Sequence, residues 1–128
     1  MTRKILTVDD SRMVRLMVAK TFQPYGCDVY EASSGTEGLS IAAAVIPDLI
    51  FLDITMPDMN GLVVLENLRQ VPELAGIPVI MLTAESGNKS IERADSLNAV
   101  GYVAKPFKYE HLLNVAGPLL NLEKTINS

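Results

Sequence analysis

The stretch LIFLDITMPDMNG, residues 49–61, decides the fold. It opens with the apolar run Leu49–Leu52, which has the length of a strand and carries no polar residue on either face. Strands of this kind are typical of parallel sheets that helices cover on both sides. Asp53 ends the run, and a loop with Pro57 follows. We therefore expect a central strand with a carboxylate at its carboxyl end.

Similar runs recur before and after this stretch, and segments with the apolar spacing of helices lie between them. The predicted strands are Lys4–Val8, Asp28–Ala32, Asp48–Asp53, Pro78–Thr83 and Gly101–Ala104. The predicted helices are Met13–Gln23, the segment from Ser34 to Pro47, Leu62–Gln70, Ile91–Leu97 and Tyr109–Leu122. The order of elements is therefore βαβαβαβαβα.

Strands joined in this way run parallel, because each helix carries the chain back to the start of the next strand. The predicted fold class is α/β: a single flavodoxin-like (βα)5 domain whose five-stranded parallel sheet has the order 2-1-3-4-5, with helices on both faces. The strand Asp28–Ala32 alternates polar and apolar residues and is the expected edge strand. We expect the domain to span residues 1–122 and residues 123–128 to form a short tail. Pro118 is expected to kink the last helix or to end it early.

The composition indicates a folded protein with a sizeable core. Of the 128 residues, 48% are hydrophobic, and the net charge of −4 lacks the basic surface that binding to nucleic acids requires. The single cysteine, Cys27, excludes an internal disulfide. No apolar run approaches the roughly 18 residues of a membrane span. We therefore expect a cytoplasmic monomer whose partners are neither nucleic acid nor membrane.

Polar side chains stand where the predicted strands end. Asp9 and Asp10 follow the first strand, Asp53 ends the third, Thr83 ends the fourth, and Lys105 follows the fifth. The carboxyl ends of parallel strands meet at one edge of the sheet, where open α/β sheets bind their ligands. Three carboxylates that converge there repel one another unless a cation or a proton intervenes.

The residue types at this edge favour one class of chemistry. Oxygen ligands without a neighbouring histidine or cysteine are those that Mg²⁺ prefers. A metal beside the Lys105 ammonium and the Thr83 hydroxyl is suited to phosphoryl transfer. Asp53 is the candidate covalent acceptor because its strand is central, and Asp9 and Asp10 are the candidate metal ligands.

These residues lie in motifs that resemble the response-regulator receiver family, and closely resemble its stand-alone chemotaxis-type members of the CheY kind. The motifs are VDDSRMVR at 8–15, LIFLDITMPDMNG at 49–61, VIMLTAE at 79–85 and GYVAKPF at 101–107. The resemblance extends from Ile5 to about Leu122. It implies that Asp53 accepts a phosphoryl group from a partner histidine kinase.

The resemblance also implies roles for the other residues of the cluster. Asp10, Asp53 and the backbone carbonyl of Thr55 would bind Mg²⁺, with Asp9 assisting directly or through water. Thr83 would donate a hydrogen bond to a phosphoryl oxygen, and Lys105 would bridge to the phosphoryl group.

Further positions correspond to the family's conformational switch. Tyr102 matches the switching aromatic, and a cis peptide is expected at Lys105–Pro106. The side chains of Thr55 and Glu85 stand where they would modulate the lifetime of the phosphoryl group.

The resulting hypothesis is a single-domain response regulator of a two-component system. It would be phosphorylated on Asp53 in a Mg²⁺-dependent reaction and would signal by protein contact, in chemotaxis before other pathways, with a flagellar motor switch as one candidate target. The alternative is an intermediate receiver of a phosphorelay. Self-catalysed phosphorylation and dephosphorylation are expected, which leaves open whether the chain should be called an enzyme.

Other classes fit the residues less well. A phosphatase of the haloacid-dehalogenase type would need a second aspartate at position 55, where Thr55 stands. A flavin carrier would need a phosphate cradle after the first strand, where Asp9 and Asp10 would repel a phosphate. A degenerate receiver would not be expected to keep the whole set of acidic, hydroxyl and lysine groups.

Overall fold

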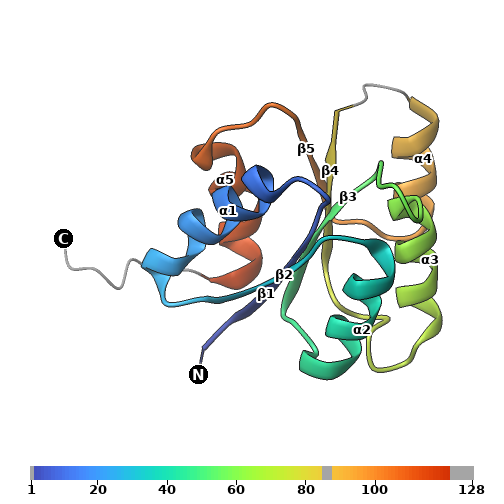
Figure 1. The fold of residues 1–128 in the computed structure, drawn as a ribbon, viewed down its shortest axis with the longest axis horizontal. Coiled ribbons are helices and arrows are strands. Elements are labelled where there is room, and N and C mark those ends of the chain that lie inside the picture. Colours follow the sequence, from blue (N-terminus) through green and yellow to red (C-terminus); the bar gives the residue numbers. More distant parts are fainter. Residues whose placement is uncertain (1, 85–87, 122–128) are drawn as a thin grey trace.

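The structure, a computed structural model, describes residues 2–84 and 88–121. Five parallel strands form one sheet with the order β2-β1-β3-β4-β5 (Figure 1), as the sequence predicts. The strands are β1 (Lys4–Val8), β2 (Asp28–Ala32), β3 (Leu49–Asp53), β4 (Val79–Thr83) and β5 (Gly101–Ala104). The helices are α1 (Arg12–Phe22), the 3-10 turn η1 (Gln23–Tyr25), α2 (Gly35–Val45), α3 (Gly61–Gln70), α4 (Asn88–Ser96) and α5 (Tyr109–Leu120).

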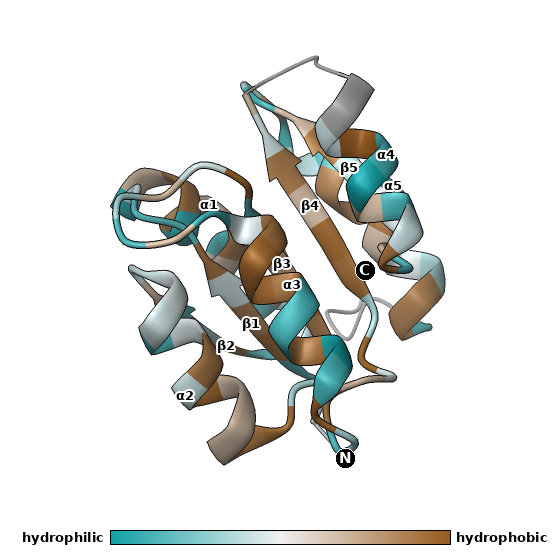
Figure 2. Cartoon of the chain, turned by 90° about the vertical axis from the view of Figure 1, so that its right-hand side faces the viewer, coloured by the Kyte–Doolittle hydropathy of each residue, from teal (hydrophilic) through white to brown (hydrophobic). Residues whose placement is uncertain are grey.

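The helices cover both faces of the sheet. Helices α1 and α5 lie on one face, and α2, α3 and α4 lie on the other (Figure 1). Strands β3 and β4 are buried along their whole length, whereas β2 is exposed at Asp28 and Glu31. In Figure 2, β4 is mainly hydrophobic while α3 combines hydrophobic and hydrophilic residues. The prediction that β2 is an edge strand is confirmed.

The central strand sends alternate side chains into two separate cores. Ile50 and Leu52 belong to the core under α2, α3 and α4, while Leu49 and Phe51 belong to the core under α1 and α5. The ring of Phe51 packs on Phe22 of α1 with 5.5 Å between the ring centroids. Burial on both faces holds β3 rigidly in place, and Asp53 is its last residue.

Two helix ends differ from the predicted ones. Helix α4 begins at Asn88, before the predicted start at Ile91. The prediction missed its first residues because they are polar and show no apolar spacing. Helix α5 continues through Pro118 to Leu120, so Pro118 itself does not end it. Near a helix end the proline removes a single hydrogen bond, the one that the Asn114 carbonyl would accept. The predicted helix end at residue 122 and the tail at 123–128 lie outside the described residues.

Among the described residues, no helix has both the length and the apolar character needed to cross a membrane.

One polar side chain in the core lacks a partner. Thr7 of β1 is fully buried, and its Oγ1 makes no hydrogen bond with any described residue. Thr21 of α1 is buried to a similar degree, but its Oγ1 donates to the Met17 carbonyl at 2.7 Å. A buried hydroxyl without a partner destabilises the folded state, because water hydrogen-bonds it in the unfolded chain.

We expect Thr7→Val to raise the free energy of unfolding by about 1 kcal/mol, because the nearly isosteric methyl group needs no hydrogen bond. The measurement is urea unfolding followed by circular dichroism. Thr21→Val is the matched control, and it should lower the free energy because it removes a hydrogen bond. A loss of stability in Thr7→Val equal to that of the control would contradict the assignment.

Candidate functional site

The carboxyl edge of the sheet gathers the five polar residues that the sequence singles out. Asp9 and Asp10 follow β1, Asp53 ends β3, Thr83 ends β4 and Lys105 follows β5. The three aspartates each place one carboxylate oxygen within 4.8 Å of the others. Residues from distant parts of the chain therefore meet as the parallel topology requires.

Lys105 bridges the two buried carboxylates. Its Nζ lies 2.8 Å from Oδ2 of Asp9 and 3.2 Å from Oδ1 of Asp53. Its backbone N–H donates to the Thr83 carbonyl, and the predicted cis peptide at Lys105–Pro106 is present. Burial alone would lower the pKa of Lys105, but the contacts with Asp9 and Asp53 outweigh burial and raise it. Lys105 is therefore a fixed cation at this edge.

Asp53 is nearly inaccessible to solvent, at 4% exposed. Burial, followed by the charge of Asp9, raises the pKa of Asp53 from 3.8 to about 6. The Lys105 cation and the backbone N–H of Thr55, which donates to the Asp53 carboxylate, act in the opposite direction. The carboxylate form thus prevails at neutral pH, although its environment remains deficient in positive charge.

The donor set at this edge fits a hard divalent cation. Oδ1 of Asp9 accepts from the Ser11 N–H at 2.9 Å, while Oδ2 has the ion pair with Lys105 and no hydrogen-bond partner among the described residues. The Asp10 side chain is exposed, so the cluster opens to solvent. Carboxylate oxygens that keep free lone pairs beside an open position are suited to Mg²⁺, which retains several waters when it binds.

The loop after β3 approaches the cluster closely at Gly61. A Cβ built on Gly61 would lie 2.0 Å from the Asp53 carbonyl oxygen, so a side chain there would displace the loop. The Gly61 N–H donates to the Ile54 carbonyl at 2.7 Å, which closes the loop. Glycine at this position therefore lets Thr55 remain beside the Asp53 carboxylate.

The family assignment follows from a comparison with family models. A model described as the response regulator receiver domain matches residues 5–116. The chain belongs to the response regulator receiver family. It is a receiver domain of two-component signalling, and membership implies a histidine kinase as phosphodonor and a downstream target. Receiver domains typically bind Mg²⁺ at an acidic cluster.

Similar proteins include a phosphotransferase, a chemotaxis protein and a DNA-binding regulator. The chain is 31% identical to sporulation initiation phosphotransferase F of Bacillus subtilis over 96% of this chain and 98% of that protein. The solved structure of chemotaxis protein CheY4 from Vibrio cholerae is 33% identical with a TM-score of 0.87, covering 93% of this chain and 99% of that one. The DNA-binding regulator RpaA of Synechocystis is 34% identical over 86% of this chain, which spans 46% of that protein.

In this receiver domain Thr83 and Tyr102 lie on the same face of the sheet. Thr83 pairs with Ala104 and Met81 pairs with Tyr102, and both Met81 and Tyr102 belong to the core under α2, α3 and α4. The Tyr102 hydroxyl carries one proton and has two acceptors within reach, the Ile91 carbonyl at 3.2 Å and the Asp95 carboxylate.

Burial and the hydrogen bond to Asp95 raise the pKa of Tyr102 to about 12. The tyrosine therefore stays neutral and connects β5 to α4.

Sequence reasoning missed two side chains that act in this region. Asp95 contacts Tyr102, and Asp58 in the loop after β3 contacts the start of α2. A carboxylate seven residues before Tyr102 has no helical or strand relation to it, so no spacing signal could have found it. Glu85, predicted to modulate the site, lies outside the described residues.

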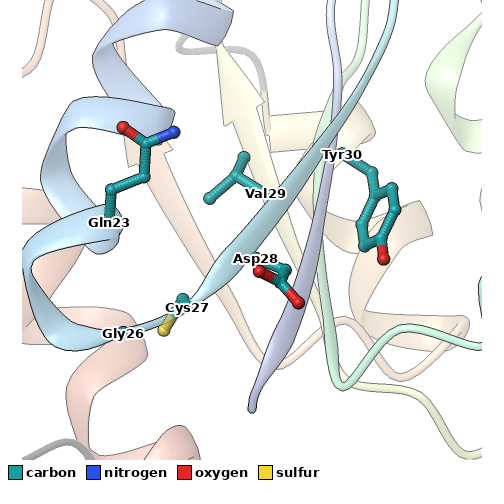
Figure 3. Close-up of a pocket in the computed structure, with 6 residues that line it drawn as sticks. All are labelled: Gln23, Gly26, Cys27, Asp28, Val29 and Tyr30. Atoms are coloured by element: carbon teal, nitrogen blue, oxygen red, sulfur yellow. The ribbon is translucent and has the colours of Figure 1, made fainter.

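A surface hollow of about 620 Å³ lies away from this edge, beside the start of β2 (Figure 3). Gln23 and Val29 lie on one side of the strand and Tyr30 on the other. Cys27 is a buried residue of its lining, and burial raises the pKa of the Cys27 thiol. No cluster of charged or nucleophilic groups lines this hollow, so we assign it no role in the chemistry.

We expect Asp53→Asn to raise the free energy of unfolding above about pH 6 when no divalent cation is present. The folded protein releases the Asp53 proton at about pH 6, but the unfolded chain releases it near 3.8. Between these values the folded state binds more protons, so wild-type stability falls as pH rises.

This shift in the pKa of Asp53 corresponds to an increase in the free energy of unfolding of Asp53→Asn of at most about 3 kcal/mol. The gain should shrink toward zero below about pH 4, as measured by urea unfolding over this pH range. A difference between the two proteins that does not change with pH would contradict the stated cause.

Proposed function

We propose that this receiver domain is a single-domain response regulator that accepts a phosphoryl group on Asp53 from a histidine kinase in a Mg²⁺-dependent reaction. The observation that carries the proposal is the pairing of the buried Asp53 carboxylate with Lys105 at 3.2 Å, beside Asp9 and Asp10. An acceptor, a cation for phosphoryl oxygens and two further carboxylates thus share one edge. The proposal takes residues 1–122 as the functional unit, as a cytoplasmic monomer without nucleic-acid or membrane partners.

The chemistry follows from the position of Asp53. An oxygen of its ionised carboxylate attacks the phosphorus of a phosphohistidine, the bond between phosphorus and the imidazole nitrogen breaks, and that nitrogen keeps the electron pair. Lys105 then pairs with a phosphoryl oxygen in place of the carboxylate oxygen that it contacts now. The Thr83 hydroxyl, at the end of the neighbouring strand, donates to a second phosphoryl oxygen.

Several residues at this edge would bind the metal together. Asp10, Asp53 and the Thr55 carbonyl would hold Mg²⁺, with Asp9 supporting it directly or through water. When bound, Mg²⁺ supplies positive charge that offsets the negative charge of the arriving phosphoryl oxygens. Thr55 contributes through its backbone, so its side chain is free to modulate phosphoryl lifetime together with Glu85.

The phosphoryl group would change the protein through Thr83 and Tyr102. A group on Asp53 that draws Thr83 inward alters the space available to Tyr102 on the same sheet face. Movement of Tyr102 disturbs its bond to the Ile91 carbonyl and so reshapes the surface of α4, β5 and α5. A nearly complete shift of such an equilibrium needs about 5.5 kcal/mol, which several charge-assisted hydrogen bonds can approach.

The acceptor assignment predicts specific labelling. Incubation with acetyl phosphate and Mg²⁺ should yield a base-labile acyl phosphate on Asp53, located by mass spectrometry of peptides. Chelation of Mg²⁺ should abolish the label because Lys105 alone does not offset the combined negative charge. Asp48→Asn, at a surface carboxylate outside the cluster, is a matched control that should label normally. Labelling of Asp53→Asn equal to that of the wild type would exclude the assignment.

Two observations bear on the pathway. The structural likeness to chemotaxis protein CheY4 supports a role in chemotaxis, with contact to a flagellar motor switch as the output. The match to sporulation initiation phosphotransferase F, over nearly the full length of both proteins, supports a phosphorelay intermediate as the second candidate. The phosphatase of the haloacid-dehalogenase type stays the weakest alternative because position 55 is Thr55.

A deletion of the gene separates the two candidates. If the domain acts in chemotaxis, the deletion should change the frequency of swimming reversals, and the wild-type gene but not Asp53→Asn should restore it. The measurement is cell tracking in the source organism. Normal swimming, together with transfer of label from Asp53 to the histidine of a phosphotransfer protein from the same genome, would support the relay and contradict chemotaxis.

A further inference from the structure

The loop between β3 and α3, residues 54–60, is attached at both of its ends. At its start the Ile54 N–H donates to the Leu82 carbonyl at 3.2 Å. At its end Asn60 caps α3 by accepting from the Leu62 N–H at 2.7 Å. These contacts fix where the loop leaves and enters regular structure, and between them Met56 is buried in the core under α2, α3 and α4.

Asp58 attaches the second half of the loop to α2 by hydrogen bonds. Its carboxylate accepts from the Gly35 N–H at 3.0 Å, the Thr36 N–H at 3.1 Å and the Thr36 hydroxyl at 3.0 Å. These are the first residues of α2, where backbone N–H groups lack partners within the helix and the helix dipole favours a negative charge. The hydrogen bonds from Gly35 and Thr36 lower the pKa of Asp58.

Close packing reinforces this attachment. A Cβ on Gly35 would lie 2.8 Å from Cγ of Met59 and 2.9 Å from a methyl group of Val64, so glycine is needed for the loop to approach α2 this closely. Helix α2 already has its own cap, because Ser34 Oγ accepts from the Glu37 N–H at 3.1 Å. Asp58 is therefore an additional contact that joins the loop to the helix.

The same loop contains Thr55, three residues before Asp58. The Thr55 N–H donates to the Asp53 carboxylate, so the position of the loop determines how that carboxylate is oriented. The Thr55 side chain is exposed and is not anchored in either core. Ile54 and Met56, on either side of Thr55, pack in the core under α2, α3 and α4, and the attachment at Asp58 adds hydrogen bonds to this apolar restraint on the loop.

We propose that Asp58 is a positioning residue for the divalent cation site, which acts by holding the loop on α2 so that Thr55 keeps its N–H on Asp53 and its carbonyl toward the ion. The inference rests on the metal site of the proposed function. A loop that is ordered before the ion arrives does not lose that conformational freedom on binding, so the ion binds more tightly.

The test compares two variants that each remove a contact at the start of α2. Asp58→Ala removes the side-chain hydrogen bonds between the loop and the helix, while Ser34→Ala removes the helix's own cap and leaves those hydrogen bonds in place. Isothermal titration with MgCl2 should show about tenfold weaker binding for Asp58→Ala, the lower end of the range for outer-shell residues. Ser34→Ala should bind as the wild type does, although both variants lose thermal stability.

A second measurement reports on the loop itself. Amide hydrogen exchange of Thr55, followed by NMR without metal, should be faster in Asp58→Ala than in the wild type or in Ser34→Ala. Asp58→Asn keeps an oxygen acceptor and should recover part of the Mg²⁺ affinity.

Equal Mg²⁺ affinity for Asp58→Ala and Ser34→Ala, both folded, would overturn the role of Asp58 while leaving the metal site intact. If the wild type itself takes up no Mg²⁺, the proposed function fails instead.

Discussion

Electrostatic repulsion between carboxylates at one edge of the sheet is the constraint on which the site depends. Asp9 and Asp53 are buried there together, and Lys105 is the cation that contacts both. Burial, followed by the charge of Asp9, raises the pKa of Asp53, and the contact with Lys105 does not offset them. The folded protein therefore holds a charge imbalance that a divalent cation relieves, and burial keeps water from screening it.

The fold supplies the rigid frame that holds this imbalance in place. Strand β3 is buried on both faces, and Phe51 and Leu52 anchor it in the two cores. Such packing fixes a backbone far more firmly than a loop could, because a shift would open cavities on both sides. The apolar contacts of the preceding four residues thus offset the free-energy cost of burying the Asp53 carboxylate.

The arrangement of strands and the membership of the acidic cluster could be predicted from sequence because both follow from local patterns. The run Leu49–Leu52 indicates a central strand, and parallel topology then brings Asp53 to Asp9 and Lys105. The start of α4 at Asn88 could not be predicted, since polar residues there carry no apolar periodicity. The place of Thr83 in the cluster followed from the strand pattern, whereas the switching role proposed for Tyr102 came from the family resemblance.

Contacts between elements that are distant in sequence were beyond such reasoning. The contact of Asp58 with Gly35 joins residues 23 positions apart, and no periodicity links them. It depends on how a loop rests on a helix from a different part of the chain. Asp58 joins the loop after β3 to α2, and Tyr102 joins β5 to α4.

The difference in burial between the strands has a mechanical consequence. Strand β3 has a neighbour on each side, whereas β5 has β4 alone and ends in the exposed Ala104. A group attached to the end of β3 therefore cannot easily displace that strand, because β1 and β4 flank it and both cores cover it. We expect the adjustment to fall on less buried residues near the site, such as Tyr102 and Ala104 of β5.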